Sequence, residues 1–201
     1  MNLLHLDSSI LGANSASRVL SAAVVARLTA ANADLNVTYR DLAAEPITHF
    51  TAEHFAAMNG GGEHDAPLRP DLATSAAVLE EFLAADIVVI GVALYNFTIS
   101  TQLKAWIDRI VIGGKTFRYG EKGPEGLAGD KRVILTIARG GFYGPGTPAA
   151  SLEHAETYLR GVFAFLGVTK LEVIVAEGLR VSDDQRQAAM AGAREKIAEL
   201  A

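Results

Sequence analysis

The stretch DIVVIGVALYNFTIS, residues 86–100, decides the fold of this chain. Residues 86–93 predict a strand that is buried on both faces, as at the centre of a parallel sheet, because everything after Asp86 in this stretch is apolar or glycine. The strand ends in Tyr95-Asn96-Phe97, two aromatic rings around an amide, instead of in a turn of Gly, Asp or Pro. Because the turn also carries no charge, it suits a flat, uncharged ligand.

Short apolar runs alternate with longer amphipathic stretches on both sides of this strand. They predict strands at 2–6, 35–40, 131–138 and 171–177, and helices at 17–32, 71–84, 100–112, 148–166 and from Ser182 to Leu200. The helix at 148–166 is expected to bury Leu152 with Leu159 and Phe163. Strands that alternate with helices predict an α/β fold, with a doubly wound five-stranded parallel sheet and helices on both faces.

Residues 41–70 are expected to be mostly loop, with a short helix near 51–58 and a flexible run at 60–62, Gly-Gly-Gly. Neither an internal repeat nor a break in composition divides the chain. A single domain of residues 1–201 is therefore expected.

Composition narrows the class of protein. The chain has 201 residues, a net charge of -5 and no cysteine. The acidic balance disfavours a nucleic-acid partner, and the lack of cysteine excludes disulfides and thiolate metal sites. No leader peptide is recognised, and the longest apolar run is far shorter than the roughly 20 residues that span a membrane. We therefore expect a cytoplasmic protein without a membrane or nucleic-acid partner.

The turn after the first strand, at 7–18, carries four serines: Ser8, Ser9, Ser15 and Ser17. Parallel α/β sheets bind ligands beyond the carboxyl ends of their strands. The glycine pattern of a dinucleotide-binding turn is absent here. Serine hydroxyls and free N–H groups at a helix start suit the terminal phosphate of a mononucleotide. The alternative is that Ser15 or Ser17 only caps the helix, and the stretch leaves both interpretations open.

The turn after the fourth strand, 138–141, ends in Gly140-Gly141. Two glycines let backbone N–H groups approach a ligand closely, although a plain tight turn is the alternative. The three turns fall at the same edge of the sheet and together describe a site for FMN, with its phosphate at the first turn. No catalytic side chain and no metal are predicted, because N5 of the flavin does the chemistry.

Other features are interpreted as unrelated to this site. The segment GGKT at 113–116 resembles the end of a phosphate-binding loop, but it follows a helix and has Arg109 where that loop needs a glycine. His49 and His54 are expected on different helix faces, as solvated residues and not as metal ligands. His5 is expected in the core or at its rim.

Four segments carry a resemblance to a known family: SSILGANSASR at 8–18, YNFTISTQLKAWID at 95–108, KTFRYGEKGPEGLAGDK at 115–131 and ARGG at 138–141. Together they resemble the FMN-dependent NADH-azoreductases, also described as FMN-dependent NADH:quinone oxidoreductases. The resemblance extends from the first strand to the last helix. It implies a flavodoxin-like fold with one FMN per subunit.

The resemblance also implies which residues bind the cofactor: Ser9, Ser15, Ala16 and Ser17 at the phosphate, Leu94, Tyr95, Asn96 and Phe97 along the isoalloxazine, and Ala138, Arg139, Gly140 and Gly141 at its pyrimidine side. Many relatives carry Gln at the position of Ala16 and Ser at that of Ala138, so this chain lacks one side-chain contact at each.

A homodimer with each flavin site at the interface is implied as well. Phe117, Tyr119 and Phe165 would shape an aromatic substrate pocket over the flavin, partly from the partner chain. Tyr143 stands near it, where some relatives have a histidine. A place in the helix core is the alternative for Phe165.

The implied activity is the reduction of quinones to hydroquinones, and of aromatic azo compounds to amines, by two-electron ping-pong transfer from NADH. A flavodoxin-like electron carrier and an NADPH-dependent FMN or quinone reductase are the alternatives. The residues do not decide between NADH and NADPH, and they do not identify the physiological substrate.

Overall fold

The structure is a computed structural model that describes residues 1–58 and 69–201. The expected flexible run at 60–62 lies outside the described residues. The strands are β1 (Asn2–Asp7), β2 (Asn36–Asp41), β3 (Ile87–Ala93), β4 (Phe117–Gly120), β5 (Gly123–Gly126), β6 (Arg132–Ala138) and β7 (Lys170–Ala176). The α-helices are α1 (Ala16–Ala31), α2 (Ala52–Met58), α3 (Arg69–Ala84), α4 (Thr101–Ile110), α5 (Ala155–Phe165) and α6 (Asp183–Ala198).

Five strands form one parallel sheet in the order β2-β1-β3-β6-β7. Strand β3 lies in the middle, and all of its residues are buried. The direction of winding reverses between β1 and β3, so the connections that leave these strands diverge and open a crevice at their carboxyl ends. The predicted five-stranded, doubly wound sheet is confirmed.

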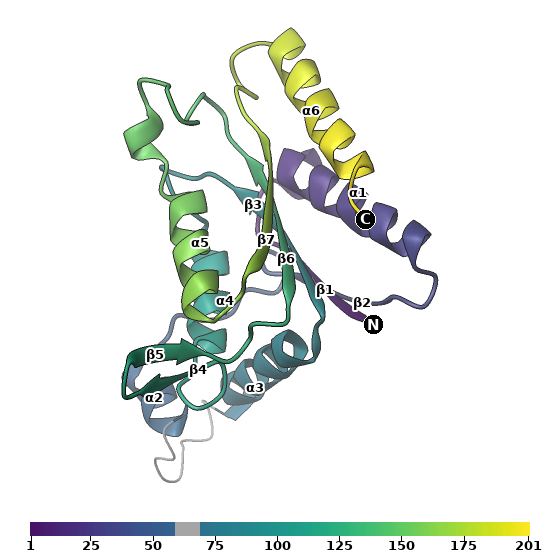
Figure 1. Cartoon of the computed structure of the whole chain (residues 1–201). Helices are drawn as coiled ribbons and strands as arrows, with labels where there is room; N and C mark the ends of the chain where they lie inside the picture. Colours follow the sequence, from purple (N-terminus) through teal and green to yellow (C-terminus); the bar gives the residue numbers. More distant parts are fainter. Residues whose placement is uncertain (59–68) are drawn as a thin grey trace.

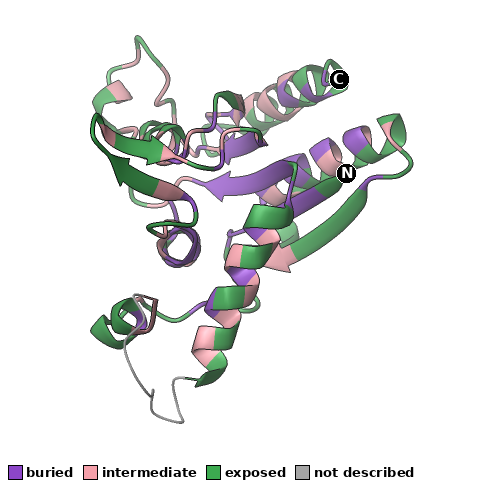
Figure 2. Cartoon of the chain, turned by 60° about the horizontal axis from the view of Figure 1, so that its bottom comes forward, coloured by how far each residue is buried: buried purple, intermediate pink, exposed green. Residues whose placement is uncertain are grey.

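Helices cover both faces of the sheet. Figure 1 shows α1 and α6 on one side and α3, α4 and α5 on the other. The two cores are built from buried aliphatic and aromatic side chains, such as Leu20 and Val24 on the first side and Phe82 and Trp106 on the second. Figure 2 shows the same burial along the central strands. Each such side chain contributes about 1.5–3 kcal/mol to folding.

Three helices begin at a serine that accepts a hydrogen bond from an N–H three residues later. These are Ser15 before α1, Ser100 before α4 and Ser182 before α6. An N-cap of this kind contributes about 1 kcal/mol to stability. The cap at Ser182 and the short helix near 51–58 are both confirmed.

The helix expected at 148–166 is shorter than predicted and begins at Ala155. Glu153 supplies the reason, because its carboxylate accepts the N–H groups of Glu156 and Thr157 and so caps the first turn. A separate 3-10 turn, Ala150–Leu152, precedes it. Leu152 is 41% exposed, so its predicted place in the core is wrong.

Strands β4 and β5 form an antiparallel hairpin that the sequence pattern did not predict. The hairpin packs backbone to backbone against the end of α5. A Cβ at Gly126 would overlap the backbone of Leu166 and Gly167, and a Cβ at Gly167 would lie 3.0 Å from the Gly126 carbonyl oxygen. Glycine at both positions permits this contact.

Candidate functional site

The first turn, after β1, is held by contacts to the central strand and to the second turn. The Ser8 hydroxyl donates to the Gly91 carbonyl at 3.0 Å. The Ser9 hydroxyl lies 3.0 Å from the hydroxyl of Tyr95, which also accepts the Ile10 N–H at 3.3 Å. Tyr95 therefore braces the first turn against the second, and stacking of its ring on a flavin stays a prediction.

The start of α1 offers hydrogen-bond donors. Ser15 caps the helix by accepting the Arg18 N–H at 3.4 Å, and its hydroxyl lies 3.0 Å from that of Ser17. The N–H groups of Ala16 and Ser17 belong to the first turn of the helix, where no intrahelical acceptor exists. The capping interpretation is confirmed for Ser15, and the phosphate interpretation stays compatible with it because these N–H groups are left over.

The second turn, after β3, has an unusual backbone. Tyr95 and Thr98 exchange two backbone hydrogen bonds of 2.9 and 3.1 Å across it. Asn96 has φ 46° and Phe97 has φ 74°, and both residues are exposed. Asparagine tolerates this region, but a left-handed phenylalanine is strained, at a cost on the order of 1–3 kcal/mol. The Phe97 carbonyl accepts the His154 N–H at 2.9 Å, which helps to hold the strained conformation.

The third turn, after β6, is tied to the second and to the loop after β7. Leu94 donates its N–H to the Ala138 carbonyl at 3.0 Å. Arg139 uses its N–H and its carbonyl within the chain, with Ala176 and Leu179. Within the described residues, the N–H groups at 140 and 141 have no protein acceptor. These two N–H groups are therefore free to meet a ligand.

The side chain of Arg139 is buried and neutralised. Its guanidinium lies 3.2 Å from Glu153, 2.8 Å from Glu156 and 3.4 Å from Glu177. Glu177 also accepts the Tyr143 N–H at 3.1 Å. Arg139 thus fixes the shape of the third turn, and a direct contact between Arg139 and a flavin stays a prediction.

The predicted pocket residues fall into two groups at opposite ends of the sheet. Tyr143 lies at the carboxyl edge, with its ring 6.2 Å from that of Phe97. The Phe117 ring lies 4.7 Å from that of Phe165 and 5.6 Å from that of Tyr119. This second group sits where the hairpin meets the end of α5, at the amino edge (Figure 1). Within one chain the structure does not bring the two groups together.

A cavity of about 670 Å³ opens beside the second group. Its aromatic and apolar lining includes Phe50, Phe55, Met58, Phe117 and Tyr119. Cavities of this size and lining are typical of sites for flat organic molecules. The three lining residues from 50–58 were not predicted, because no local pattern indicates which way α2 and the residues before it face.

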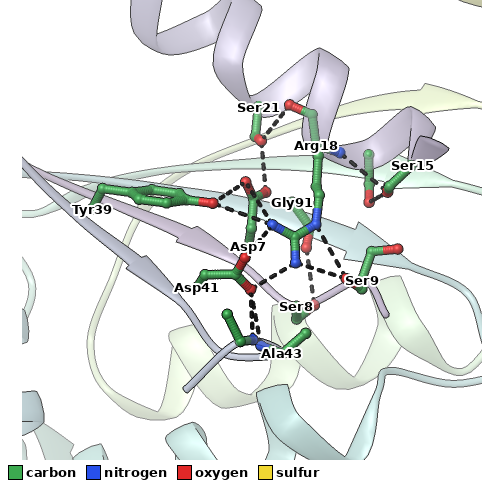
Figure 3. Close-up of polar contacts among 12 residues, drawn as sticks. Asp7, Ser8, Ser9, Ser15, Arg18, Ser21, Tyr39, Asp41, Ala43 and Gly91 are labelled. Atoms are coloured by element: carbon green, nitrogen blue, oxygen red, sulfur yellow. Dashed lines mark hydrogen bonds and ion pairs between the residues drawn. The ribbon is translucent and has the colours of Figure 1, made fainter. Parts of the chain in front are cut away.

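A polar cluster lies beside the first turn, next to α1 (Figure 3). Arg18 forms a bidentate ion pair with Asp41, both contacts being 2.6 Å. Tyr39 accepts from Arg18 at 3.2 Å and donates to Asp7 at 3.2 Å. These side chains line an open hollow of about 620 Å³. Buried His5 lies 3.0 Å from the Ser21 hydroxyl, in agreement with its expected place at the rim of the core.

Hydrogen bonds and burial shift the pKa values of this cluster. The hydrogen bonds with Asp41 raise the pKa of Arg18, and the same contacts hold the pKa of Asp41 below its ordinary value. Burial, followed by the charge of Asp7, raises the pKa of Tyr39 to about 12. Burial lowers the pKa of His5. At neutral pH the cluster therefore contains a firmly ionised Arg18–Asp41 pair and a neutral tyrosine.

A second polar cluster corrects the interpretation of His54. This histidine is 2% exposed, not solvated, and its Nε2 contacts the Asp71 carboxylate. Fully buried Arg109 donates from Nη2 to Thr48 and lies 3.2 Å from Asp71. The ring of Phe50 lies 5.2 Å from the guanidinium carbon. The cluster joins α2, α3 and α4, and its partners come from segments far apart in the sequence.

No group of three or more His, Cys, Asp or Glu side chains suited to a metal occurs among the residues that the structure describes. Over residues 1–58 and 69–201, none of the helices has the length and apolar character needed to cross a membrane. The predicted cytoplasmic location stays a prediction.

Known proteins share this fold over its full length. The family model described as "Flavodoxin-like fold" matches residues 1–201. The FMN-dependent NADH:quinone oxidoreductase 2 of Bradyrhizobium diazoefficiens is 57% identical over 200 residues, which cover 100% of this chain and 98% of that protein. The FMN-dependent NADH:quinone oxidoreductase of Xanthomonas campestris pv. campestris is 60% identical over 199 residues, 98% of each chain.

Among solved structures, the azoreductase AzrA superposes with a TM-score of 0.91 at 30% identity, covering 99% of this chain and 98% of its own. An azoreductase from Bacillus anthracis gives 0.90 at 31% identity, with 99% and 97% covered. Fold and turns thus define the class, a flavodoxin-like α/β protein. Within that class, the chain belongs to the family of FMN-dependent NADH:quinone oxidoreductases.

Proposed function

We propose that this chain, as one FMN-binding domain of residues 1–201, uses NADH to reduce quinones and aromatic azo compounds. The observation that carries the proposal is the convergence of three turns at the carboxyl edge of the sheet. Each turn presents N–H groups that lack acceptors within the described residues, and each is fixed by contacts to another part of the chain. The names of the relatives supply the cofactor, the donor and the two substrate classes.

The first turn fits the phosphate of FMN. The start of α1 directs the N–H groups of Ala16 and Ser17 outward, and the positive end of the helix dipole favours a dianion there. The hydroxyls of Ser9, Ser15 and Ser17 add donors without adding charge. We propose that all four residues contact the phosphate, with Ala16 acting through its backbone alone.

The second and third turns fit the ring system. The strained Asn96–Phe97 backbone aims an amide side chain and a phenyl ring away from the core, and both are exposed. Within the described residues the Asn96 side chain has no hydrogen-bond partner. We propose that Leu94, Tyr95, Asn96 and Phe97 line the isoalloxazine. The 138–141 turn would meet its pyrimidine side through the N–H groups of Gly140 and Gly141.

Bound FMN would supply the redox chemistry, which is two-electron transfer from NADH to the acceptor. The chain supplies position and electrostatics. The N–H groups at Asn96 and Gly140 stabilise negative charge that develops on a bound ring. Phe97 and Tyr143 cover the site from water. We propose that donor and acceptor occupy the same space in turn, which gives ping-pong kinetics.

The positions of the pocket residues support a homodimer. Phe117, Tyr119 and Phe165 lie at the amino edge of the sheet, whereas the three turns lie at the carboxyl edge. A second chain is needed to bring this aromatic group to a flavin. The groove between α4 and α5 is apolar, has a volume of about 410 Å³, and contains Phe165 together with Val111 and Val162. We propose that a second copy covers this groove.

Purified protein tests the cofactor and the activity. We expect it to bind FMN and to oxidise NADH in the presence of menadione or methyl red, with parallel lines in double-reciprocal plots. Protein that neither carries nor binds FMN would overturn the proposal. FMN binding without turnover of either acceptor would favour an electron carrier. Replacing NADH by NADPH at matched concentration decides which donor is preferred.

The homodimer is tested by light scattering. Val162→Glu places a charge in the apolar groove, and we expect it to yield monomers that keep FMN binding but lose most of the turnover. Val37→Glu, an equal change on the exposed edge strand β2, is the matched control and should stay dimeric. A monomeric wild-type protein with full turnover would contradict the proposed dimer.

A further inference from the structure

Arg18 carries no role in the proposed function, yet it is the best-connected side chain beside the first turn. Its Nε and Nη2 both donate to the Ser9 carbonyl oxygen, at 3.1 and 2.8 Å. Its Nη1 and Nη2 donate to Asp41, and Nη1 also donates to Tyr39. An arginine has five N–H donors, and these five contacts use all of them. Arg18 therefore has no donor left for a ligand.

The contact with Ser9 fixes the turn at its centre. The Ser9 carbonyl is held by Arg18, and the Ser9 hydroxyl is 3.0 Å from the Tyr95 hydroxyl and accepts the Leu11 N–H at 3.3 Å. Figure 3 shows the guanidinium lying between Asp41 and the backbone of Ser9. The turn that would bind a phosphate is thus clamped from the side of β2 and from the second turn.

The charges near Arg18 are unfavourable to an anion without it. Asp7 ends β1, directly before the serines of the first turn, and Asp41 ends β2 beside it. Arg18 lies 3.9 Å from Asp7 and pairs bidentately with Asp41. Loss of Arg18 would leave two carboxylates beside the proposed phosphate position, in a chain that is acidic overall. Repulsion between like charges is strong where access to water is limited.

We propose that Arg18 is a positioning residue that makes the first turn selective for the phosphate group of FMN, by clamping the Ser9 backbone and by neutralising Asp7 and Asp41. The proposal rests on the proposed function, because it assumes that FMN binds at this turn. Arg18 therefore raises the affinity for the phosphate group of FMN and leaves the affinity for the ring unchanged.

The test compares FMN with riboflavin, which has the ring but lacks the phosphate. Both flavins are titrated into apo-protein and binding is followed by the quenching of flavin fluorescence. For Arg18→Ala we expect the Kd for FMN to rise about tenfold, because the phosphate then meets an unclamped turn and two uncompensated carboxylates. We expect the Kd for riboflavin to change less than about twofold, and the FMN penalty to shrink as salt is raised.

Charge rescue separates electrostatics from structure. The double variant R18A/D41N lacks one uncompensated carboxylate and should recover most of the FMN affinity. Arg18→Lys keeps the charge but not the fork of donors, and should fall between wild type and R18A. Arg40→Ala is the matched control. Arg40 pairs bidentately with Glu81 at 2.9 and 2.6 Å and is about as exposed as Arg18. It should leave the ratio of the two Kd values unchanged.

Three results would overturn the proposal: equal weakening of FMN and riboflavin in R18A, the same change of ratio in R40A, or no recovery in R18A/D41N. If R18A does not fold, Arg18→Lys and Asp41→Asn decide the matter. Asp41→Asn should bind FMN at least as tightly as wild type, and a tenfold loss there would show a structural role only. Wild-type protein that binds neither flavin would defeat the proposed function itself, a different outcome from all of these.

Discussion

Two arginine clusters use similar residues in different surroundings. Arg18 has a carboxylate partner, a tyrosine and a nearby histidine, and it borders an open hollow. Arg109 has a carboxylate, a histidine and a phenylalanine, and it is fully buried. Every donor of Arg18 has an acceptor. Nε and Nη1 of Arg109 have none among the residues that the structure describes.

The pKa values express this difference. Hydrogen bonds with Asp41 raise the pKa of Arg18, whereas burial lowers that of Arg109. Arg18 holds the Ser9 backbone beside the start of α1, where the N–H groups of Ala16 and Ser17 have no acceptor within the described residues, so its satisfied donors shape the proposed binding turn. Arg109 holds α2 against α3 and α4, so its effect is on the stability of the wall beside the aromatic cavity. The same type of side chain thus supports the proposed phosphate-binding turn in one place and a packed interior in the other.

The largest expected effect separates the two clusters by stability. Arg109→Ala leaves Asp71 and His54 facing a cavity, and we expect it to cost about 3–5 kcal/mol in the free energy of unfolding. Arg18 is 14% exposed and borders an open hollow, so Arg18→Ala should cost only about 1–2 kcal/mol. Urea unfolding of the apo-protein measures both. Arg109→Met retains the packed stem and removes unpaired donors, so it should cost less than Arg109→Ala. Equal losses in R18A and R109A would break the comparison.

Next in size is a change at Gly91, below the Arg18 cluster. A Cβ at this position would overlap the Asp7 carboxylate and lie 3.3 Å from the Ser17 carbonyl oxygen. Gly91→Ala should therefore cost about 1–3 kcal/mol through overpacking in the central strand. Removing the obstruction in G91A/D7A should recover part of the loss, as measured by thermal unfolding. An additive double variant would show that Asp7 is not the cause.

Acid should weaken both clusters, for different reasons. Hydrogen bonds from Arg18 hold the pKa of Asp41 low. Burial raises the pKa of Asp71, but hydrogen bonds from Thr48 and His54 and the charge of Arg109 lower it overall. A depressed carboxyl pKa stabilises the fold above the unfolded value near 4, and this contribution is lost as pH falls through the folded value.

The free energy of unfolding below about pH 4 should therefore fall less steeply in Asp41→Asn and in Asp71→Asn than in wild type. Each substitution removes the uptake of at most one proton. The slope of the free energy of unfolding against pH therefore changes by at most about 1.4 kcal/mol per pH unit. Urea unfolding at a series of pH values measures it. Asp34→Asn, an equal change on an exposed turn, is the control.

The smallest effect is spectroscopic. With a pKa of about 12, Tyr39 should ionise above the ordinary tyrosine value near 10, and Tyr39→Phe should remove that step from an ultraviolet titration. The charge of Arg18 lowers this pKa, so Arg18→Ala should move the step to higher pH. Arg109→Met should leave it in place. A step that moves in R109M instead would assign it to another tyrosine.

The sequence predicted the regular part of the fold well, because period and burial act locally. The residues of β3 are apolar at both odd and even positions, which predicts burial on both faces of the strand. Ser182 stands directly before an amphipathic stretch, which predicts a helix that begins there. The hairpin β4–β5 lacks the alternation of a strand, and its stability comes from the close fit of Gly126 on the end of α5. Such a contact joins residues about 40 positions apart and leaves no local pattern.

The candidate site was predicted in part for the same reason. Topology places the three turns at one edge, so the turns were located from the strand ends. The individual cofactor contacts were implied by the family resemblance and stay predictions. The role of Arg18 could not be predicted from the sequence, because its partners, Tyr39 and Asp41, lie on the neighbouring strand β2. His54 was misplaced because Asp71 and Arg109, which make its burial favourable, lie 17 and 55 residues further along.

The glycine contact between the hairpin and α5 has a consequence for how this protein can diversify. Gly126 and Gly167 meet through backbone atoms, so this contact uses no side chain of β4, although Phe117 adds its own packing on Phe165. Position 119, whose side chain is 79% exposed, can accept new side chains while the chain path stays the same. A gene duplicate could therefore alter which aromatic molecules it accepts through single substitutions on a fixed frame, provided that both glycines are inherited together.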